Sequence, residues 1–139
     1  MTSMPDVLHS QPWRWPNFPH DEVARVCHGG VRMVPCFLDR LQTLRLSYGK
    51  PIILTSAYRA PEYNLQVSTT GTQGPHTTGR AVDILVCGED ALDLIGRAWV
   101  NGFTGIGLKQ HGPHNKRFVH LDDLPDNVNH PRPILWTYA

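Results

Sequence analysis

The sequence lacks several features that define whole classes of protein. It has no apolar run close to the roughly 18 residues that a membrane-spanning helix needs. It has no excess of charge of either sign, because 13 lysines and arginines oppose 12 aspartates and glutamates. The resulting net charge of +1 argues against a protein that coats nucleic acid or carries an acidic tail. No internal repeat and no shift in composition divides the 139 residues, so we expect a single domain, residues 1–139.

Cysteine is scarce, and we expect no secretion signal from the pattern of the first residues. Cys27, Cys36 and Cys87 are odd in number and widely spaced, which excludes a disulfide framework and a CxxC zinc motif. We expect them to be buried free thiols in a protein made in a reducing cytoplasm. The first twenty residues lack the basic start and the apolar stretch of a signal peptide.

Proline clusters at both ends of the chain. Four prolines in residues 1–19 exclude a regular helix there, while Trp13, Trp15 and Phe18 are too apolar for a free tail. We therefore expect an extended arm that packs its rings onto the domain. Three further prolines mark residues 124–139 as a tail that packs on the domain and can add an edge strand at residues 134–138.

The segments between these ends show helical and strand-like hydrophobic patterns. The expected helices are residues 20–25, 31–48 and 89–100, with a helical turn at 61–65. In the last helix, we expect Leu92, Ile95, Ala98 and Trp99 to face inward. The expected strands are residues 51–56, 80–86, 103–108 and 118–121. Helices segregated from short strands indicate the α+β class.

Histidine, by contrast, is frequent. The chain has eight histidines in 139 residues, at positions 9, 20, 28, 76, 111, 114, 120 and 130. A neutral imidazole is a common metal ligand in proteins, so this count raises the question of a metal site.

Two segments carry the residues best suited to bind a metal ion. His76 and Asp83 are seven residues apart, and Gly79 lies between them where a loop can turn into a strand. His120 lies in an independent strand, so two elements would converge. Two imidazoles and one carboxylate make a catalytic zinc site with a fourth position left for water. The spacing alone fits equally well a loop histidine, a capping aspartate and a core histidine.

Four ordered motifs resemble a known family. They are Thr55-Ser-Ala-Tyr-Arg59, Gly74-Pro-His-Thr-Thr-Gly-Arg-Ala-Val-Asp83-Ile84, Gly105-Ile-Gly107 and Phe118-Val-His-Leu-Asp122. In this order they are similar to the zinc D-Ala-D-Ala carboxypeptidases, a family that includes phage endolysin-type members and shares its fold with the hedgehog signalling domain. The resemblance covers about residues 18–122. It implies a small antiparallel sheet with helices packed on it.

The resemblance also implies roles for individual residues. His76, Asp83 and His120 would bind Zn²⁺, although the same ligand set also suits cobalt, manganese or nickel. Arg59 would hold the carboxylate of the substrate or polarise its carbonyl, because a guanidinium is permanently charged and forks onto oxygen atoms. Tyr58 is a candidate for lining the substrate pocket, and a core aromatic is the alternative.

The general base is the point at which the sequence departs from its relatives. Several relatives carry a carboxylate three residues before the last ligand histidine, whereas this chain has Arg117, and a cation cannot act as a base. We expect Asp122 to be the base, with His114 or His111 as an alternative or an electrostatic helper. Both loop histidines fit solvated surface positions as well. A second departure is Gly74, where relatives often carry serine.

The resemblance therefore implies a zinc peptidase that cuts peptidoglycan stem peptides at a D-amino acid bond, as a D,D-carboxypeptidase or an endopeptidase. We expect a phage or prophage lysis or tail enzyme that is made in the cytoplasm and acts on the cell wall. The alternative is a non-catalytic, zinc-stabilised binding or virion module of the same fold. We expect no nucleic-acid partner, because the charge is balanced and the Trp-rich arm suits sealing a core.

Overall fold

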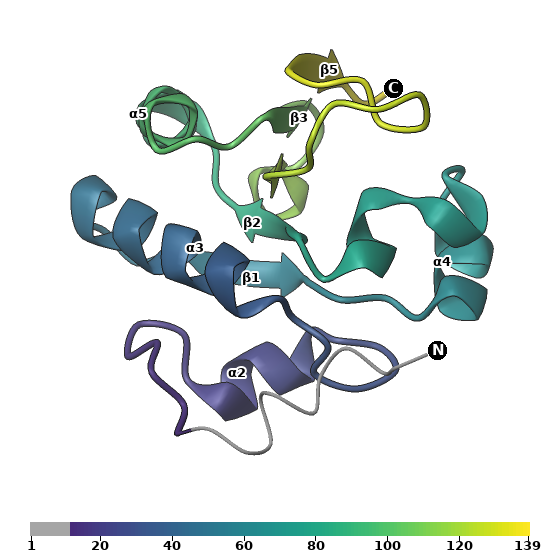
Figure 1. The fold of residues 1–139 in the computed structure, drawn as a ribbon. Helices are drawn as coiled ribbons and strands as arrows, with labels where there is room; N and C mark the ends of the chain where they lie inside the picture. The colour runs from purple at the N-terminus through teal and green to yellow at the C-terminus, as the bar shows by residue number, and fades with distance from the viewer. Residues whose placement is uncertain (1–11) are drawn as a thin grey trace.

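A five-stranded mixed sheet runs through the centre of the protein (Figure 1). The computed structural model describes residues 12–139, so residues 1–11 of the expected N-terminal arm lie outside the described residues. The strands are β1 (Ile53–Ser56), β2 (Ala81–Leu85), β3 (Gly105–Lys109), β4 (Phe118–Asp122) and β5 (Ile134–Thr137). Their order across the sheet is β1-β2-β4-β3-β5.

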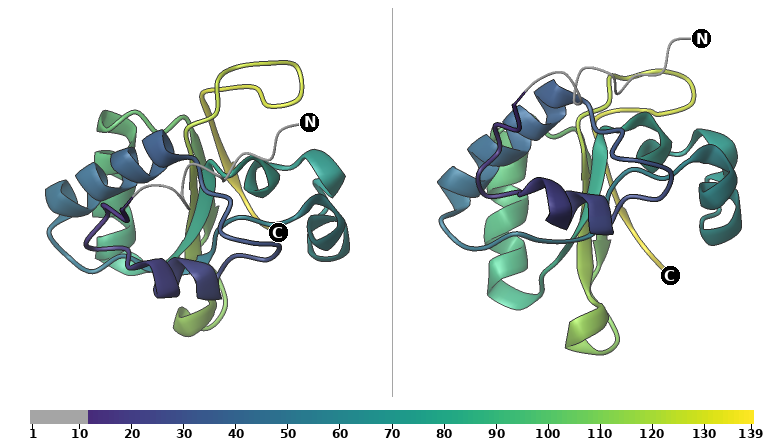
Figure 2. Two further views of the ribbon diagram at one scale, coloured as in Figure 1. Left: turned by 60° about the horizontal axis from the view of Figure 1, so that its bottom comes forward. Right: turned by 90° about the horizontal axis from the view of Figure 1, so that it is seen from below.

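Helices cover the two sides of this sheet unequally. The helices are α2 (His20–Arg25), α3 (Pro35–Tyr48), α4 (Pro61–Val67) and α5 (Gly88–Val100), with short 3₁₀ turns η1 (Gly71–Gln73), η2 (Pro75–Thr78) and η3 (His114–Lys116). Figure 2 shows α3 and α5 together on one side of the sheet, and α4 with its neighbouring turns on the other. The α+β prediction is confirmed.

The alternation of side chains along the strands separates a core from a polar face. Val82 and Ile84 of β2, with Val119 and Leu121 of β4, are buried in the main hydrophobic cluster. The residues between them include Asp83 and face the other side, towards α4 and η2. The sheet therefore has one face that stabilises the fold and one face that is free to carry polar groups.

Most expected elements are present, with two differences in the sheet and the long helix. The first four strands pair antiparallel, as the resemblance implied, but β5 joins the edge of β3 in parallel, which makes the sheet mixed. Helix α3 begins at Pro35 rather than at residue 31, because proline suits the first turn of a helix and cannot donate a hydrogen bond further inside it.

The prediction that four residues of α5 face inward is wrong for two of them. Leu92 is 74% exposed and Trp99 is 57% exposed, whereas Ala91, Leu94 and Ala98 are buried. The apolar residues of this helix extend over more than one face, so periodicity did not distinguish the side that contacts the sheet. The small side chains of Ala91 and Ala98 allow close packing on either side of Leu94.

This difference between the two leucines is directly testable. We expect Leu94→Ala to lower the free energy of unfolding by about 2–5 kcal/mol, because it leaves a cavity in the core. We expect Leu92→Ala to change it by less than about 0.5 kcal/mol, because that side chain already contacts solvent. Denaturant titration of both variants measures the two effects, and equal losses would contradict the observed packing of α5.

The described part of the N-terminal arm packs onto the domain. Trp15 and Phe18 are buried in the main cluster. The Trp15 indole donates a hydrogen bond to Asp39 of α3 (2.8 Å), and the Trp13 indole donates to the Phe18 carbonyl (2.7 Å). These bonds satisfy the polar atoms that the buried rings bring with them.

Two further expectations concern cysteines and membranes. All three cysteines are free, as predicted, but Cys36 is exposed and Cys27 and Cys87 are only partly buried, so the expectation of buried thiols is wrong. No helix within residues 12–139 combines the length and apolar character needed to cross a membrane.

Candidate metal centre

His76 is held by a turn immediately before strand β2. It lies in η2, which Gly79 ends with a left-handed backbone conformation (φ 76°) that favours glycine. The His76 ring is buried, and its Nδ1 lies 2.7 Å from the carbonyl oxygen of Ala57. A carbonyl can only accept, so Nδ1 carries the proton and a neutral ring leaves Nε2 with a free lone pair.

Asp83 and His120 are direct neighbours on the polar face of the sheet. Residue pairing aligns Asp83 of β2 with His120 of β4, His120 with Gly107 of β3, and Gly107 with Trp136 of β5. Paired residues in a sheet point to the same side, so these four positions form one row. The row brings together residues that are far apart in the sequence.

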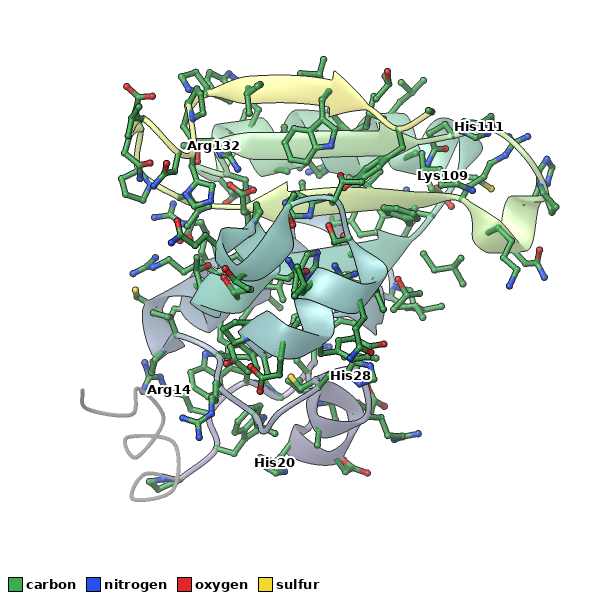
Figure 3. The ribbon with its side chains drawn as sticks, turned by 90° about the vertical axis from the view of Figure 1, so that its right-hand side faces the viewer. Arg14, His20, His28, Lys109, His111 and Arg132 are labelled. Atoms are coloured by element: carbon green, nitrogen blue, oxygen red, sulfur yellow. The ribbon has the colours of Figure 1, made fainter. Side chains whose placement is uncertain are left out.

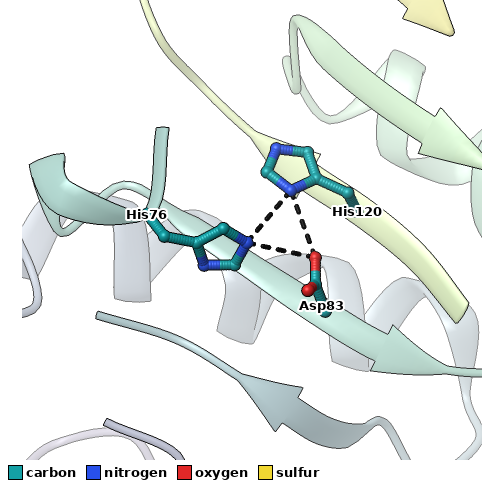
Figure 4. Close-up of side chains that lie close together, drawn as sticks. All are labelled: His76, Asp83 and His120. Atoms are coloured by element: carbon teal, nitrogen blue, oxygen red, sulfur yellow. Dashed lines mark hydrogen bonds and ion pairs between the residues drawn. The ribbon is translucent and has the colours of Figure 1, made fainter. Parts of the chain in front are cut away.

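Three potential ligand atoms converge at this row (Figure 4). His76 Nε2 and His120 Nδ1 each lie 3.2 Å from Asp83 Oδ1, and the two nitrogens are 3.3 Å apart. Ligands bound about 2.0 Å from a tetrahedral Zn²⁺ ion are separated from one another by about 3.3 Å. The observed triangle therefore has the size of a tetrahedral metal site.

The protonation of the two rings supports the same conclusion. His120 Nε2 lies 2.7 Å from the Asp122 carboxylate, to which it donates, so a neutral His120 directs its Nδ1 lone pair towards Asp83. Two nitrogen lone pairs and a carboxylate oxygen then face one another, which is unfavourable unless a cation lies between them. Metal-binding histidines commonly donate their second N–H to a carbonyl or a carboxylate, as both rings do here.

Burial and neighbouring charges shift the pKa values of His76, Asp83 and His120. The shifts of the two histidines have opposite directions. Burial lowers the pKa of His76, despite the attraction of Asp83. Burial alone would raise the pKa of Asp83, but the neighbouring His76 and His120 hold it well below its usual range. Burial also opposes protonation of His120, yet the adjacent carboxylates of Asp122 and Asp83 raise its pKa. Asp83 therefore stays ionised, as a metal ligand must be.

Arg59 lies in the same cavity as the three ligand residues. The cavity encloses about 520 Å³, and its wall includes Arg59, His76, Asp83 and His120. Arg59 Nη2 is 3.5 Å from Asp83 Oδ2, the oxygen that does not face the histidines. Its side chain is also held by Ser56 Oγ (3.1 Å). The Arg59 guanidinium is therefore held beside the candidate metal site. There it can orient an anionic or carbonyl oxygen of a substrate.

A buried asparagine holds Arg59 and explains the glycine at position 74. Asn64 Oδ1 accepts a hydrogen bond from Arg59 Nη1 (3.2 Å), and its amide donates to Thr70 Oγ1 (2.9 Å) and to the Gly71 carbonyl. A Cβ atom at Gly74 would lie 2.0 Å from Thr70 Oγ1. Thr70 and Asn64 therefore occupy the space that the serine of relatives would need.

Asp122 does not occupy the position of a general base, so this prediction is corrected. Its carboxylate is completely buried and binds His120 Nε2, on the opposite side of the ring from the ligand atom. Burial would raise its pKa, but hydrogen bonds from His120 and Arg132 lower it to about 2. Asp122 is not among the residues that line the cavity, so its carboxylate does not face the space in which a general base would act.

Three other expected site residues lie outside this cavity. His114 is exposed and lines a separate hollow with Tyr48 and Lys50, so the structure does not bring it to the ligand cluster. His111 is exposed at the opposite end of the sheet from Arg132 (Figure 3). Tyr58 is buried in the hydrophobic cluster, which corrects its assignment to substrate binding.

The C-terminal segment supplies site residues that sequence reasoning missed. Trp136 and Tyr138 line the cavity with Phe118. The Trp136 ring lies 5.0 Å from the His120 ring, and Arg132 binds Asp122. Burial and the charge of Asp83 raise the pKa of Tyr138 to about 12, so its hydroxyl stays protonated. The only sequence signal was the aromatic pattern of the expected edge strand.

The row also explains a glycine of the third motif and gives a testable prediction. A Cβ atom at Gly107 would lie 2.5–2.7 Å from three atoms of the Trp136 indole, so Gly107→Ala should cost about 1–3 kcal/mol of stability through overpacking. The matched control is Gly96→Ala in α5, where a Cβ atom meets nothing within 4 Å and should stabilise the helix by about 0.5–1 kcal/mol. Denaturant titration measures both, and effects of the same sign would refute this account.

Comparison with known proteins agrees with this geometry. No curated protein and no solved structure matches the chain significantly. The family model described as Peptidase M15 matches residues 17–122, which include all three ligand residues and Arg59. The match spans most of the chain, and its family consists of metallopeptidases, whose chemistry requires a site such as the His76–Asp83–His120 cluster. The chain therefore belongs to the peptidase M15 family.

Proposed function

We propose that this protein is a zinc-dependent peptidase that hydrolyses peptidoglycan stem peptides at a D-amino acid bond. The observation that carries the proposal is the convergence of His76 Nε2, His120 Nδ1 and Asp83 Oδ1 at the wall of a cavity that also contains Arg59. The choice of zinc and of a cell-wall substrate follows the resemblance to the D-Ala-D-Ala carboxypeptidases. A phage or prophage lysis or tail enzyme is the biological setting that we propose.

Each residue has a defined task in this proposal. His76, Asp83 and His120 would hold the ion, which supplies an activated water molecule and polarises the scissile carbonyl. The Arg59 guanidinium would bind the carboxylate or the carbonyl of the substrate, held in place by Ser56 and Asn64. Phe118, Trp136 and Tyr138 form an apolar wall that limits the access of bulk water to the bond.

One observation favours a second candidate, a non-catalytic zinc-stabilised module. Arg117 replaces the carboxylate of several relatives, and its Nε donates to the Gly112 carbonyl (2.9 Å) in the surface loop. Among residues 12–139, those lining the cavity include one side-chain carboxylate, that of Asp83, which the metal site uses. A protein that only binds wall peptides or stabilises a virion would need the metal but no general base.

Digestion of stem peptides separates the two candidates. The zinc-loaded protein is incubated with muropeptides that end in D-Ala-D-Ala and with matched peptides that end in L-Ala-L-Ala, and the products are identified by mass spectrometry. The proposal predicts cleavage of the D-series and loss of cleavage when the metal is removed with a chelator. Zinc-loaded protein that binds the peptides without cleaving any of several wall chemotypes would refute it and support the binding module.

A further inference from the structure

The last ligand histidine is supported by a buried ion pair from the C-terminal segment. Arg132 Nε donates to Asp122 Oδ1 (2.9 Å), and Arg132 Nη2 donates to Asp122 Oδ2 (2.8 Å). The Arg132 side chain is 6% exposed and that of Asp122 is completely buried. Asp122 Oδ2 also accepts the hydrogen bond from His120 Nε2 (2.7 Å). Arg132, Asp122 and His120 are therefore linked by a continuous series of hydrogen bonds that ends at the metal cluster.

The fold leaves space for this series of hydrogen-bonded side chains. Residue pairing places Asp122 opposite Gly105, and a Cβ atom at Gly105 would lie 2.3 Å from Asp122 Oδ1. The backbone N–H of Arg132 donates to Asp126 Oδ1 (2.8 Å), which fixes the backbone of the loop before β5. A carboxylate buried this deeply needs strong donors, and the two-point contact with a guanidinium satisfies both oxygens.

A second contact from the same segment packs on the ligand itself. The Trp136 ring lies 5.0 Å from the His120 ring and beneath the Arg132 guanidinium, which is 5.7 Å from the indole centre. Arg132 and Trp136 both lie beyond residue 122, where the match to the peptidase family ends. This chain therefore supports its last ligand with residues outside the matched region.

We propose that Arg132 is a positioning residue of the metal centre. It orients the Asp122 carboxylate so that Asp122 accepts the Nε2 proton of His120, which leaves Nδ1 as the metal-binding nitrogen. Without the guanidinium, Asp122 loses two donors and its fixed orientation, and His120 is free to adopt the other tautomer. The inference depends on the metal centre but not on the identity of the substrate.

The neighbouring aspartate provides a matched control. The side chain of Asp123 is also buried, and two arginines bind it: Arg80 Nη1 lies 3.1 Å from both of its oxygens, and Arg40 Nε lies 3.3 Å from Oδ2. Within residues 12–139, Asp123 forms no hydrogen bond or ion pair with a histidine. Arg132→Met removes the guanidinium that binds both oxygens of Asp122, and Arg80→Met removes the guanidinium that binds both oxygens of Asp123, which keeps Arg40 as a partner. Only Arg132→Met removes a guanidinium from the hydrogen-bonded side chains that lead to the metal site.

The test measures Zn²⁺ affinity by competition with a chromophoric chelator, without any peptidase assay. We expect Arg132→Met to weaken Zn²⁺ binding about 10–100-fold, Arg132→Lys to restore part of the loss, and Arg80→Met to leave affinity unchanged. Equal affinities for Arg132→Met and Arg80→Met would overturn the proposal. Failure of the protein to cleave any peptide would leave this result intact, so the two proposals fail separately.

A spectroscopic measurement distinguishes positioning from general stabilisation. In ¹⁵N-histidine-labelled, metal-free protein at a pH at which the His120 ring is neutral, the ring nitrogen shifts of His120 report which nitrogen is protonated. We expect the Nε2–H form in the parent protein and in Arg80→Met, and a mixture of tautomers in Arg132→Lys, which keeps the charge but not the two-point contact. An unchanged Nε2–H form in Arg132→Lys together with unchanged Zn²⁺ affinity would assign Arg132 a purely structural role.

Discussion

Replacing either ligand histidine with alanine is expected to abolish stable metal binding. His76→Ala and His120→Ala each leave one imidazole and one carboxylate, which is fewer than the three protein ligands of a catalytic zinc site. If the metal supplies about 4 kcal/mol of transition-state stabilisation, its loss lowers the hydrolysis rate by about 10³-fold. Metal analysis of the purified variants measures the first effect directly.

Thermal unfolding gives an independent measure of the same prediction. Zinc at about 1,000 times its Kd should stabilise the parent protein by about 4 kcal/mol, and neither variant should respond. His111→Ala is the control, because His111 is exposed and is not among the residues that line the cavity of the cluster. Metal content and a zinc-dependent rise in Tm that persist in both ligand variants would disprove the assignment of the site.

The second large effect concerns Arg59, the fixed cation of the cavity. Arg59→Met removes the group proposed to bind the substrate carboxylate or carbonyl, and we expect kcat/KM to fall by about 10²–10³-fold. Arg59→Lys should recover little of this activity, because a lysine cannot reproduce the fork that binds Ser56, Asn64 and Asp83 together.

Zinc content separates this effect from damage to the metal site. Arg59 lies 3.5 Å from the Asp83 oxygen that does not face the histidines, so zinc should remain bound in Arg59→Met. Arg25→Met is the matched control, because Arg25 is an exposed residue of α2 with a surface ion pair. Full activity in Arg59→Met would remove this residue from the proposed mechanism.

The sequence by itself determined the fold class, and its resemblance to the carboxypeptidase family singled out the three residues that cluster in the structure. The long amphipathic helix, the short strands and the ordered motifs around His76, Asp83 and His120 rest on local patterns that survive folding. Arg59 was identified through the resemblance to the carboxypeptidase family, as the last residue of the motif Thr55-Ser-Ala-Tyr-Arg59. These features depend on neighbours in sequence or on a motif order that the family shares.

Only the tertiary structure decided the roles of the remaining residues, because those roles depend on pairing between distant segments. Asp122 shares a strand face with His120, but the structure shows that its carboxylate binds the outer nitrogen of that ring and Arg132. The parallel pairing of β5 with β3 brings Trp136 onto the row of the ligands. A short edge strand carries no local signal of its register. The hydrogen bonds and packing that form only in the folded sheet therefore assign the C-terminal segment to the metal centre.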